Sequence, residues 1–292
     1  MINHKNIKNI KPKRVVVFGG SGYIGKEIVK ELKKRRINIL EINSEQVNLL
    51  KSEAVAKICK QIQEKDVILI LAGITPDKGK EIEHFKINIL IMINIIKGII
   101  NSKGVSHIIY FSSDAVYGEK KGMVSEQTIT QPCNAYGMMH YAREQLLKEY
   151  INNVPTLVIR PTMIYGKNDT HNAYGPNRFI RTALEKKEIT INGNGSEMRD
   201  YIYIDDVVKI TVEYIYKKTI GIVNLASGHS VSIRELREII GKEMDNKIIF
   251  NFNSQVQAAN YNRHYDTTVL MSSLKHIKIT NLEIGIQKMI IS

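Results

Sequence analysis

A glycine-rich turn near the start of the chain constrains the fold more than any other feature of the sequence. The segment "RVVVFGGSGYIGKEIVKELKKRR" joins a run of β-branched residues to a helical pattern, with Gly19, Gly22 and Gly25 spaced as GxxGxxG. Between a buried strand and a helix, such a turn lets the backbone approach a pyrophosphate and turns the free N–H groups of the helix toward it. The segment therefore predicts a dinucleotide-binding unit.

The following residues repeat the same alternation of short apolar strands and helices. Strands are predicted at "INILEI", "DVILILAG", "SHIIYFSS" and "TLVIRP", with helical patterns between them. This alternation predicts an α/β fold with a Rossmann-type doubly wound parallel sheet. After about residue 165 the pattern becomes irregular, which favours a smaller C-terminal α/β substrate lobe. We expect a flexible leader at 1–13, a dinucleotide-binding domain at 14–165, and at 166–292 a lobe that also returns strands to the main sheet.

Composition narrows the class of partner. The 42 Lys and Arg residues exceed the 29 Asp and Glu residues, and the resulting net charge of +13 attracts anions. Because no stripe of basic and aromatic residues accompanies this charge, we expect a phosphorylated small molecule as partner, and neither nucleic acid nor a membrane. The cysteines and histidines lack metal-ligand spacing, and the longest apolar run, 87–100, is too short to span a bilayer. We expect a cytoplasmic protein without a metal site.

The end of the second predicted strand bears on the choice between NAD and NADP. A carboxylate there binds the ribose hydroxyls and repels the 2′-phosphate of NADP. In "LEINSEQVNLL", Glu41 is expected inside the strand, and the uncharged Asn43 and Ser44 take the deciding position. The choice between NAD and NADP therefore stays open. Asn48 and Leu49 follow, where we expect the adenine to be covered.

In their order along the chain, these and later motifs resemble the extended short-chain dehydrogenase/reductase family, which includes sugar-nucleotide epimerases, dehydratases and reductases. The matching segments are "GGSGYIG", "LAG" with Asn88, "FSSDAVYG", Tyr136, "RPTMIYG", "RDYIYIDDVV" and "GIVNLASGHSVSIRELREII". The resemblance implies an enzyme that binds NAD or NADP and a nucleotide sugar, and that forms a homodimer. The cofactor-binding residues expected from the turn and the resemblance are Gly19, Ser21, Gly22, Tyr23, Ile24, Gly25, Asn43, Asn48, Leu49, Leu71, Ala72, Gly73, Asn88, Tyr136, His140, Pro161 and Met163.

The resemblance also implies the chemistry. Ser113 matches the residue that hydrogen-bonds the reacting hydroxyl or ketone, and Tyr136 matches the tyrosine that exchanges its proton while nicotinamide exchanges hydride with the same carbon. Family dehydratases carry Asp and Glu after this serine, whereas this chain carries Asp114 and Ala115, so the base for eliminating water is missing. The cysteine that GDP-fucose synthases use at the alanine position is missing too. Redox chemistry at a sugar carbon remains.

Three functions are compatible with these residues. The leading interpretation is an NAD(P)-dependent oxidoreductase that carries out net reduction or oxidation of a nucleotide-activated sugar, most often at C4. A C4-epimerase is the alternative enzyme, because it uses the same hydride transfer transiently. A non-catalytic NAD(P)-binding regulator on the same fold is the alternative from another class.

One residue departs from the family pattern. The family lysine lies four residues after the tyrosine, so that both project from one helix face; it bonds the nicotinamide ribose and lowers the pKa of the tyrosine. Here His140 takes that position. A protonated imidazole would give the same electrostatic help, but its ordinary pKa of about 6.5 leaves it mostly neutral at pH 7. We therefore expect weaker help that depends more on pH.

The resemblance places most substrate contacts in the C-terminal lobe. Arg199 in "EMRDYIY" matches the arginine that grips the nucleotide diphosphate, a task suited to a bidentate guanidinium. The segment "THNAYGPNRF", 170–179, contributes Asn177 and Arg178, and Arg263 is expected to add a second phosphate contact. Asp114, from the first lobe, is expected to orient a sugar hydroxyl, with a structural cap as the alternative role.

Overall fold

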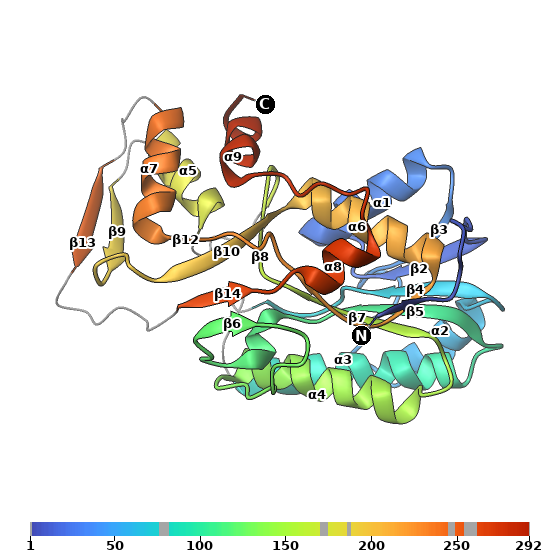
Figure 1. Ribbon diagram of the computed structural model, residues 1–292. Helices are drawn as coiled ribbons and strands as arrows, with labels where there is room; N and C mark the ends of the chain where they lie inside the picture. Colours follow the sequence, from blue (N-terminus) through green and yellow to red (C-terminus); the bar gives the residue numbers. More distant parts are fainter. Residues whose placement is uncertain are drawn as a thin grey trace. The chain divides into compact units, whose positions relative to one another are not determined.

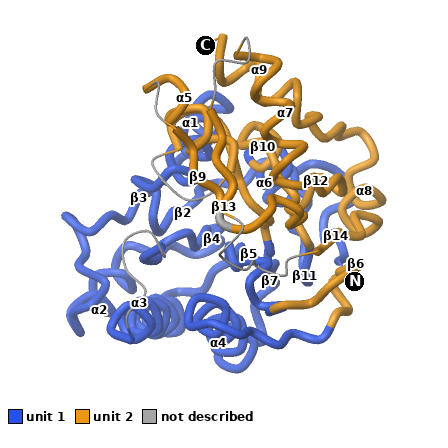
Figure 2. Tube along the Cα trace, turned by 90° about the vertical axis from the view of Figure 1, so that its left-hand side faces the viewer, with its two compact units in different colours: residues 1–118, 129–160, 208–223 blue, residues 119–128, 161–207, 224–292 orange. Residues whose placement is uncertain are grey.

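The computed structural model describes residues 2–75, 82–169, 175–185, 188–244, 249–253 and 262–291. The chain divides into two compact units, which Figure 2 shows in different colours. Unit 1 contains residues 1–118, 129–160 and 208–223, and unit 2 contains residues 119–128, 161–207 and 224–292. Each unit is therefore assembled from segments that are far apart in the sequence.

Among the described residues, unit 1 is built on a seven-stranded sheet with the strand order β1-β11-β7-β5-β4-β2-β3. Its parallel strands are β2 (Arg14–Phe18), β3 (Asn38–Ile42), β4 (Asp66–Ile70), β5 (Val105–Phe111) and β7 (Thr156–Pro161). β11 (Thr219–Leu225) lies beside β7 and pairs antiparallel with β1 (Asn3–His4). The central strands are buried on both faces, as their continuous apolar runs require. The predicted doubly wound α/β fold is confirmed.

Helices cover both faces of this sheet (Figure 1). On one face lie α2 (Glu53–Gln61), α3 (Ile82–Ile100) and α4 (Ala135–Tyr150), and on the other lie α1 (Tyr23–Lys34) and the part of α6 (Ile204–Lys217) that belongs to unit 1. Ile68, Ile95 and Ile108 are fully buried in one hydrophobic cluster of this unit. Each side chain of this size contributes about 1.5–3 kcal/mol on complete burial, so the core holds the sheet and helices together. No helix in the described part of the chain is long and apolar enough to cross a bilayer.

The strand order reverses between β2 and β4, because the chain passes from β2 to β3 on one side and then crosses to β4 on the other. Doubly wound sheets bind ligands at the carboxyl ends of the strands beside such a reversal. Gly19 follows β2 with φ of +90°, and a Cβ there would lie 2.7 Å from the backbone nitrogen of Ala72, just after β4. A left-handed residue without a side chain is therefore required where the glycine turn meets the end of β4.

The structure differs from the expected flexible leader at 1–13. Asn3 and His4 form β1 at the edge of the sheet, and the backbone N–H groups of Asn6 and Ile10 donate to carbonyl groups in the last turn of α6. The physical reason is the edge of β11, whose backbone groups need partners that a polar segment can provide. The residues between Asn3 and Ile10 are thus tied to unit 1.

Unit 2 contains smaller sheets. In its described part, β8 (Met163–Tyr165), β10 (Met198–Tyr203) and β12 (Ser230–Ser232) form one sheet, β9 (Ile189–Asn192) pairs with β13 (Phe250–Asn253), and β6 (Gly122–Val124) pairs with β14 (Arg263–Tyr265). Its helices are α5 (Pro176–Leu184), α7 (Ile233–Glu243), α8 (Thr268–Ser273) and α9 (Leu282–Ile291). The division of the chain differs from the expected boundary at residue 165, because residues 119–128 also belong to unit 2. They contain β6, which pairs with β14 from the C-terminal part of the chain.

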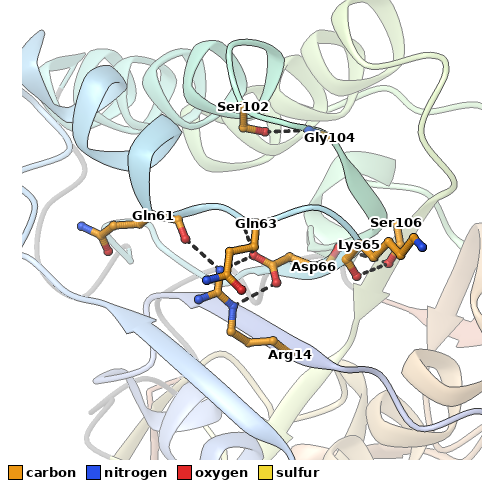
Figure 3. Close-up of polar contacts among 8 residues, drawn as sticks. All are labelled: Arg14, Gln61, Gln63, Lys65, Asp66, Ser102, Gly104 and Ser106. Atoms are coloured by element: carbon orange, nitrogen blue, oxygen red, sulfur yellow. Dashed lines mark hydrogen bonds and ion pairs between the residues drawn. The ribbon is translucent and has the colours of Figure 1, made fainter.

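An ion pair between half-buried Arg14 and buried Asp66 joins the amino ends of β2 and β4 (Figure 3). Arg14 donates through Nε and Nη2 to the two carboxylate oxygens of Asp66, at 2.9 and 2.5 Å, and Nη2 also donates to the carbonyl of Gln61 at 2.8 Å. The Asp66 side chain is 3% exposed and accepts the N–H of Gln63 at 2.8 Å. A buried carboxylate needs these donors, because water cannot replace them.

Removal of the arginine should leave Asp66 buried without its charged partner. We expect Arg14→Met to lower the free energy of unfolding by about 2–3 kcal/mol, slightly below the range for fully buried pairs because Arg14 is partly exposed. Urea unfolding followed by circular dichroism measures this change. Lys30→Met on the exposed surface of α1 is the control and should change the value by less than about 0.5 kcal/mol. An equal midpoint for Arg14→Met and wild type would contradict the expectation.

Candidate active site

The glycine turn leaves the start of α1 open to an anion. Gly22 is the N-cap residue and provides no side-chain hydrogen bond, and the first turn of α1 has no acidic residue. The N–H groups of that turn and the positive end of the helix dipole can therefore bind a phosphate. A Cβ on Gly25 would collide with the carbonyl oxygen of Gly19, so turn and helix approach closely because both residues are glycine. The predicted cofactor residues from Gly19 to Gly25 all lie on this turn and the first turn of α1.

A carboxylate faces the same turn from β3. Glu41 Oε2 lies 3.0 Å from the position that a Cβ on Gly20 would occupy, and Glu41 Oε1 accepts from Lys33 Nζ at 2.9 Å. The sequence pattern places Glu41 inside the strand and gives it no role. In the structure it is the acidic group at the glycine turn.

The residues expected around the adenine have local backbone contacts. Asn43 Oδ1 accepts the N–H of Gln46 at 3.0 Å, and Asn48 Oδ1 accepts the N–H of Leu50 at 3.0 Å. Leu49 packs against the hydrophobic cluster of unit 1. Asn43 and Asn48 thus shape the loop after β3, and their contact with adenine stays a prediction.

The segment after β4 is held by an amide from α3. Buried Asn88 accepts the N–H of Ile74 at 2.8 Å and donates to the carbonyl of Ile74 at 3.1 Å. Leu71, Ala72 and Gly73 lie between β4 and this contact. A Cβ on Gly73 would lie 3.0 Å from both Asn88 Oδ1 and Arg143 Nη1, so the predicted cofactor segment sits beside a guanidinium that the sequence pattern did not indicate.

Ser113 follows β5 and caps a short 3-10 helix, η1 (Asp114–Tyr117). Its Oγ accepts the N–H of Ala115 at 3.1 Å and donates to Asp114 Oδ1 at 3.3 Å. The side chain of Ser113 is buried, and that of Asp114 is half-buried. Asp114 therefore contacts Ser113 in this structure, while its predicted contact with a sugar hydroxyl stays a prediction.

Tyr136 lies at the start of α4, next to η1. The N-cap residue Asn134 accepts the N–H of Gly137 at 2.9 Å, which fixes the first turn of the helix. A Cβ on Gly137 would collide with the carbonyl oxygen of Ala115, so α4 begins directly against η1. The fold of unit 1 thus brings the element that begins at Ser113 and the helix turn that carries Tyr136 into contact.

His140 lies one turn further along α4 and is almost completely buried. Its Nδ1 shares a hydrogen bond of 2.7 Å with the hydroxyl of Tyr110 on β5, and its ring packs edge-on against Tyr136 with centroids 4.6 Å apart. Burial, together with the nearby charge of Arg143, lowers the pKa of His140 well below its ordinary value. Burial likewise raises the pKa of Tyr110. His140 and Tyr110 are therefore a neutral hydrogen-bonded pair near pH 7.

Arg143 extends the same face of α4. Its guanidinium is buried, lies 5.1 Å from the ring centroid of Tyr110, and donates through Nη2 to the carbonyl of Ala72 at 2.7 Å. The ion pairs formed within the described ranges do not include Arg143. Sequence reasoning missed both Tyr110 and Arg143. For Arg143 the available signal was helical spacing, because a residue seven positions after Tyr136 shares its face. Tyr110 lies on β5, and its contact with His140 has no local signal in the sequence.

A second buried network holds α4 against the sheet. Glu144 Oε1 and Oε2 accept from Nε and Nη2 of Arg160 on β7, at 3.0 and 2.6 Å. Ser112 donates to Glu144 at 2.5 Å, and Arg160 Nη1 donates to the hydroxyl of Tyr117 on η1 at 3.0 Å. The network therefore joins α4, β7, η1 and the end of β5.

In unit 2, two of the predicted substrate arginines lie on neighbouring strands. An isolated parallel bridge pairs Met198 with Asn262, so the next residues, Arg199 and Arg263, follow in equivalent positions. Arg199 is half-buried and lies 3.4 Å from a carboxylate oxygen of Glu197. Arg263 is fully buried, and its Nη1 donates to the hydroxyl of Tyr265 at 3.0 Å. Although they are far apart in the sequence, these arginines are brought together by the pairing of β10 with the segment before β14.

The other predicted substrate residues have different environments. Asn177 is buried on α5, and its amide both accepts the N–H of Gly166, at 3.1 Å, and donates to its carbonyl, at 2.6 Å. The amide thus anchors the loop after β8, and a substrate contact stays a prediction. Arg178 on the same helix is half-buried. Residues 170–174 of the segment "THNAYGPNRF" lie outside the described residues.

A buried aspartate fixes the segment expected near the nicotinamide. Asp200 accepts from Thr162 Oγ1 and from the backbone N–H groups of Ser227 and Gly228, each at 2.8 Å. Pro161 ends β7 and Met163 begins β8, so the threonine between them is the point of attachment. Pro161 is buried and Met163 half-buried. No group of three or more His, Cys, Asp or Glu side chains suited to a metal ion occurs among the residues that the structure describes.

The environment of His140 predicts its protonation state. We expect the imidazole to stay neutral from about pH 8 to pH 6, because its folded-state pKa lies below the ordinary value of about 6.5. The unfolded chain then binds more protons than the folded chain below about pH 6.5, so this residue lowers folding stability as the pH falls. Nitrogen NMR of labelled histidine, assigned with His140→Gln, measures the titration. A midpoint near 6.5 for His140 would contradict this expectation.

Comparison with known proteins agrees with this fold. Residues 15–226 match the model of the NAD dependent epimerase/dehydratase family. The chain is 25% identical to an uncharacterized UDP-glucose epimerase, YtcB, of Bacillus subtilis, covering 94% of this chain and 95% of the relative, and 28% identical to a putative UDP-glucose 4-epimerase of Methanocaldococcus jannaschii, covering 79% and 82%. The fold is similar to that of the UDP-glucuronic acid 4-epimerase from Bacillus cereus, with a TM-score of 0.81 at 23% identity over 94% of this chain and 97% of the other. The chain therefore belongs to the NAD-dependent epimerase/dehydratase family of enzymes.

Proposed function

We propose that the protein is a sugar-nucleotide C4-epimerase that uses NAD. The observation that carries this proposal is the close approach of Gly137 on α4 to Ala115 on η1, which brings the helix turn of Tyr136 against the short helix that Ser113 caps, with an alanine at 115. This set can move a proton at one sugar oxygen, but it has no further acid or base at position 115 for elimination or for protonation of carbon. The chemistry of an epimerase at C4 needs no more than that.

The residues of unit 1 fit the cofactor. The glycine turn and the open N-terminus of α1 suit the pyrophosphate, and Gly19 and Gly73 leave no room for side chains beside Ala72 and Arg143. Glu41 beside Gly20 supports NAD over NADP, because its carboxylate would repel a 2′-phosphate. When bound, the nicotinamide ring accepts a hydride from the sugar and returns it.

The chain's own residues handle the proton and the substrate. Ser113 would hydrogen-bond the C4 oxygen, and Tyr136 would accept the proton of the C4 hydroxyl as the ketone forms and return it when the C–H bond is made again. If the hydride leaves one face of C4 and returns to the opposite face, the configuration at C4 is inverted with no net oxidation. Arg199 and Arg263 would bind the diphosphate of the nucleotide, since guanidinium groups match phosphate oxygens.

Net reduction or oxidation at C4, the leading interpretation from the sequence alone, uses the same residues. The two relatives named above support epimerisation, because both are named as UDP-glucose epimerases, one of them specifically a 4-epimerase. The two reactions differ in their cofactor balance: an epimerase leaves the amount of NADH unchanged, while a dehydrogenase or reductase changes it in proportion to product. The homodimer and the cytoplasmic location stay predictions.

The proton-transfer role predicts a specific loss of activity. We expect the purified enzyme to interconvert the C4 epimers of at least one sugar in a panel of UDP-, GDP-, dTDP- and CDP-sugars, with constant NADH absorbance. Tyr136→Phe should lower kcat by about 10²–10⁴-fold, the range for loss of a general acid–base group, while NAD remains bound. Chromatography of the sugar nucleotides measures turnover.

Tyr150→Phe is the matched control, because Tyr150 lies at the exposed end of the same helix, and it should leave kcat unchanged. A change in NADH in proportion to product would show that the protein is a net oxidoreductase and not an epimerase. Tight NAD binding without turnover or affinity for any sugar nucleotide would support the non-catalytic regulator instead.

A further inference from the structure

A tyrosine that accepts a proton near neutral pH needs a positive charge close by, because the ordinary pKa of its hydroxyl is about 10. His140 does not meet this need. It is buried against Tyr110 and Tyr136, and desolvation disfavours its charged form. A cation supplied by the chain, in addition to the positive charge of the oxidised nicotinamide, would therefore come from another residue on the same side of α4.

Helical geometry identifies the group. With 3.6 residues per turn, positions 136, 140 and 143 fall on one face, and residues seven apart lie roughly 10 Å apart along the axis. Arg143 is a permanent cation, so its charge does not change over the working pH range. Its guanidinium lies over the ring of Tyr110. The hydroxyl of Tyr110 is hydrogen-bonded to His140, and the ring of His140 contacts the ring of Tyr136.

The burial of Arg143 indicates that its charge has a use. The side chain is 2% exposed, its Nε has no hydrogen-bond partner, and the ion pairs of the described ranges leave it out. A buried charge without a carboxylate partner is costly to keep, so a purely structural role would favour an uncharged side chain. An anionic group that forms nearby during the reaction would compensate that charge.

The other ionisable groups around this face do not supply the charge. Glu144 on α4 is neutralised by Arg160 from β7, and Tyr110 on β5 stays protonated. Asp114 on η1 is acidic and would oppose the ionisation of a tyrosine. Lys148 is exposed in the last turn of α4, so Arg143 is the buried cation without a carboxylate partner among the described groups on these elements.

We propose that Arg143 is the cation that stabilises the tyrosinate form of Tyr136, with the neutral pair His140 and Tyr110 as the packed link between them. The proposal rests on the proposed function only in taking Tyr136 as the proton-transferring group. Arg143 is then a positioning residue that acts through the electrostatic field. At roughly 10 Å and an effective dielectric constant of about 20, one charge changes a pKa by about one unit, or tenfold in the ionisation constant.

The test measures the ionisation of Tyr136 directly. In protein labelled with carbon-13 at tyrosine Cζ, the Tyr136 resonance is assigned by comparison with Tyr136→Phe and followed against pH in the presence of NAD. We expect Arg143→Gln, which keeps a donor for the carbonyl of Ala72 but removes the charge, to raise the Tyr136 pKa by about one unit. Arg143→Lys keeps a charge, so its Tyr136 pKa should differ from the wild-type value by less than about half a unit.

A relocated charge separates electrostatics from packing. In the double variant His140→Lys/Arg143→Gln the cation moves to position 140, and we expect the Tyr136 pKa to return to the wild-type value or below. Circular dichroism confirms that each variant is folded. If Arg143→Gln does not fold, Arg143→Met, which also removes the charge, takes its place, and its Tyr136 pKa should likewise lie about one unit above the wild-type value.

Two outcomes would overturn the proposal. An unchanged Tyr136 pKa in folded Arg143→Gln would show that the charge does not act on the tyrosine, and weaker NAD binding in that variant would then assign Arg143 to the cofactor. If the Tyr136 pKa of the double variant is raised as much as that of Arg143→Gln, the change comes from altered packing and not from the lost charge. Because the titration needs no sugar, failure of the proposed epimerase activity leaves this test intact.

Discussion

The buried ion pair between Glu144 and Arg160 fixes the arrangement of the candidate site residues of unit 1. Both side chains are 4% exposed, so neither charge can be stabilised by water. The bidentate contact and the hydroxyl of Ser112 give both carboxylate oxygens donors, and the hydroxyl of Tyr117 accepts from Nη1 of Arg160. A buried pair is tolerated under this condition. Because Glu144 comes from α4 and Arg160 from β7, the pair fixes the helix against the sheet. Such a pair contributes mainly to the uniqueness of this arrangement, since an apolar replacement of the same volume could be equally stable.

This pairing also decides the electrostatics of the neighbouring helix turn. Glu144 directly follows Arg143, and an unpaired glutamate there would cancel the charge of the arginine. Its engagement by Arg160 leaves Arg143 to point toward Ala72 and the ring of Tyr110. Adjacent residues on a helix diverge by about 100°, so the two side chains reach different parts of unit 1. On α4, Glu144 is thus neutralised by its ion pair with Arg160, while the adjacent Arg143 keeps its positive charge.

The sequence predicted the elements better than their partners. The glycine turn, the strands of the doubly wound sheet and the register of Tyr136 and His140 follow from local spacing, because period and turn chemistry are properties of neighbouring residues. The pairing of Asn3 and His4 with β11 joins residues more than 200 positions apart, so no local pattern indicates it. The same holds for β6 with β14 and for Arg199 beside Arg263.

The candidate site shows the same limit. The spacing of Tyr136 and His140 indicates a shared helix face, but the protonation state of the histidine depends on burial against Tyr110, which comes from β5. Glu41 presents a similar case: an alternating strand pattern places it, and only the approach of β3 to Gly20 makes it a neighbour of the glycine turn. Charge state and ligand contact are properties of the assembled sheet.

A helix tolerates the replacement of a lysine by histidine when another residue of the same face can carry the charge. Moving the cation from position 140 to position 143 keeps it on the face of Tyr136, because seven residues complete almost two turns. The side chain then approaches from the direction of β4, beside Ala72 and Gly73, and the histidine becomes a neutral filler hydrogen-bonded to Tyr110. Since guanidinium does not titrate below about pH 12, such an arrangement makes the environment of Tyr136 less sensitive to pH than a charged histidine would. A histidine at 140, where the family resemblance implies a lysine, is therefore compatible with the proposed proton transfer, provided that the charge at 143 is kept.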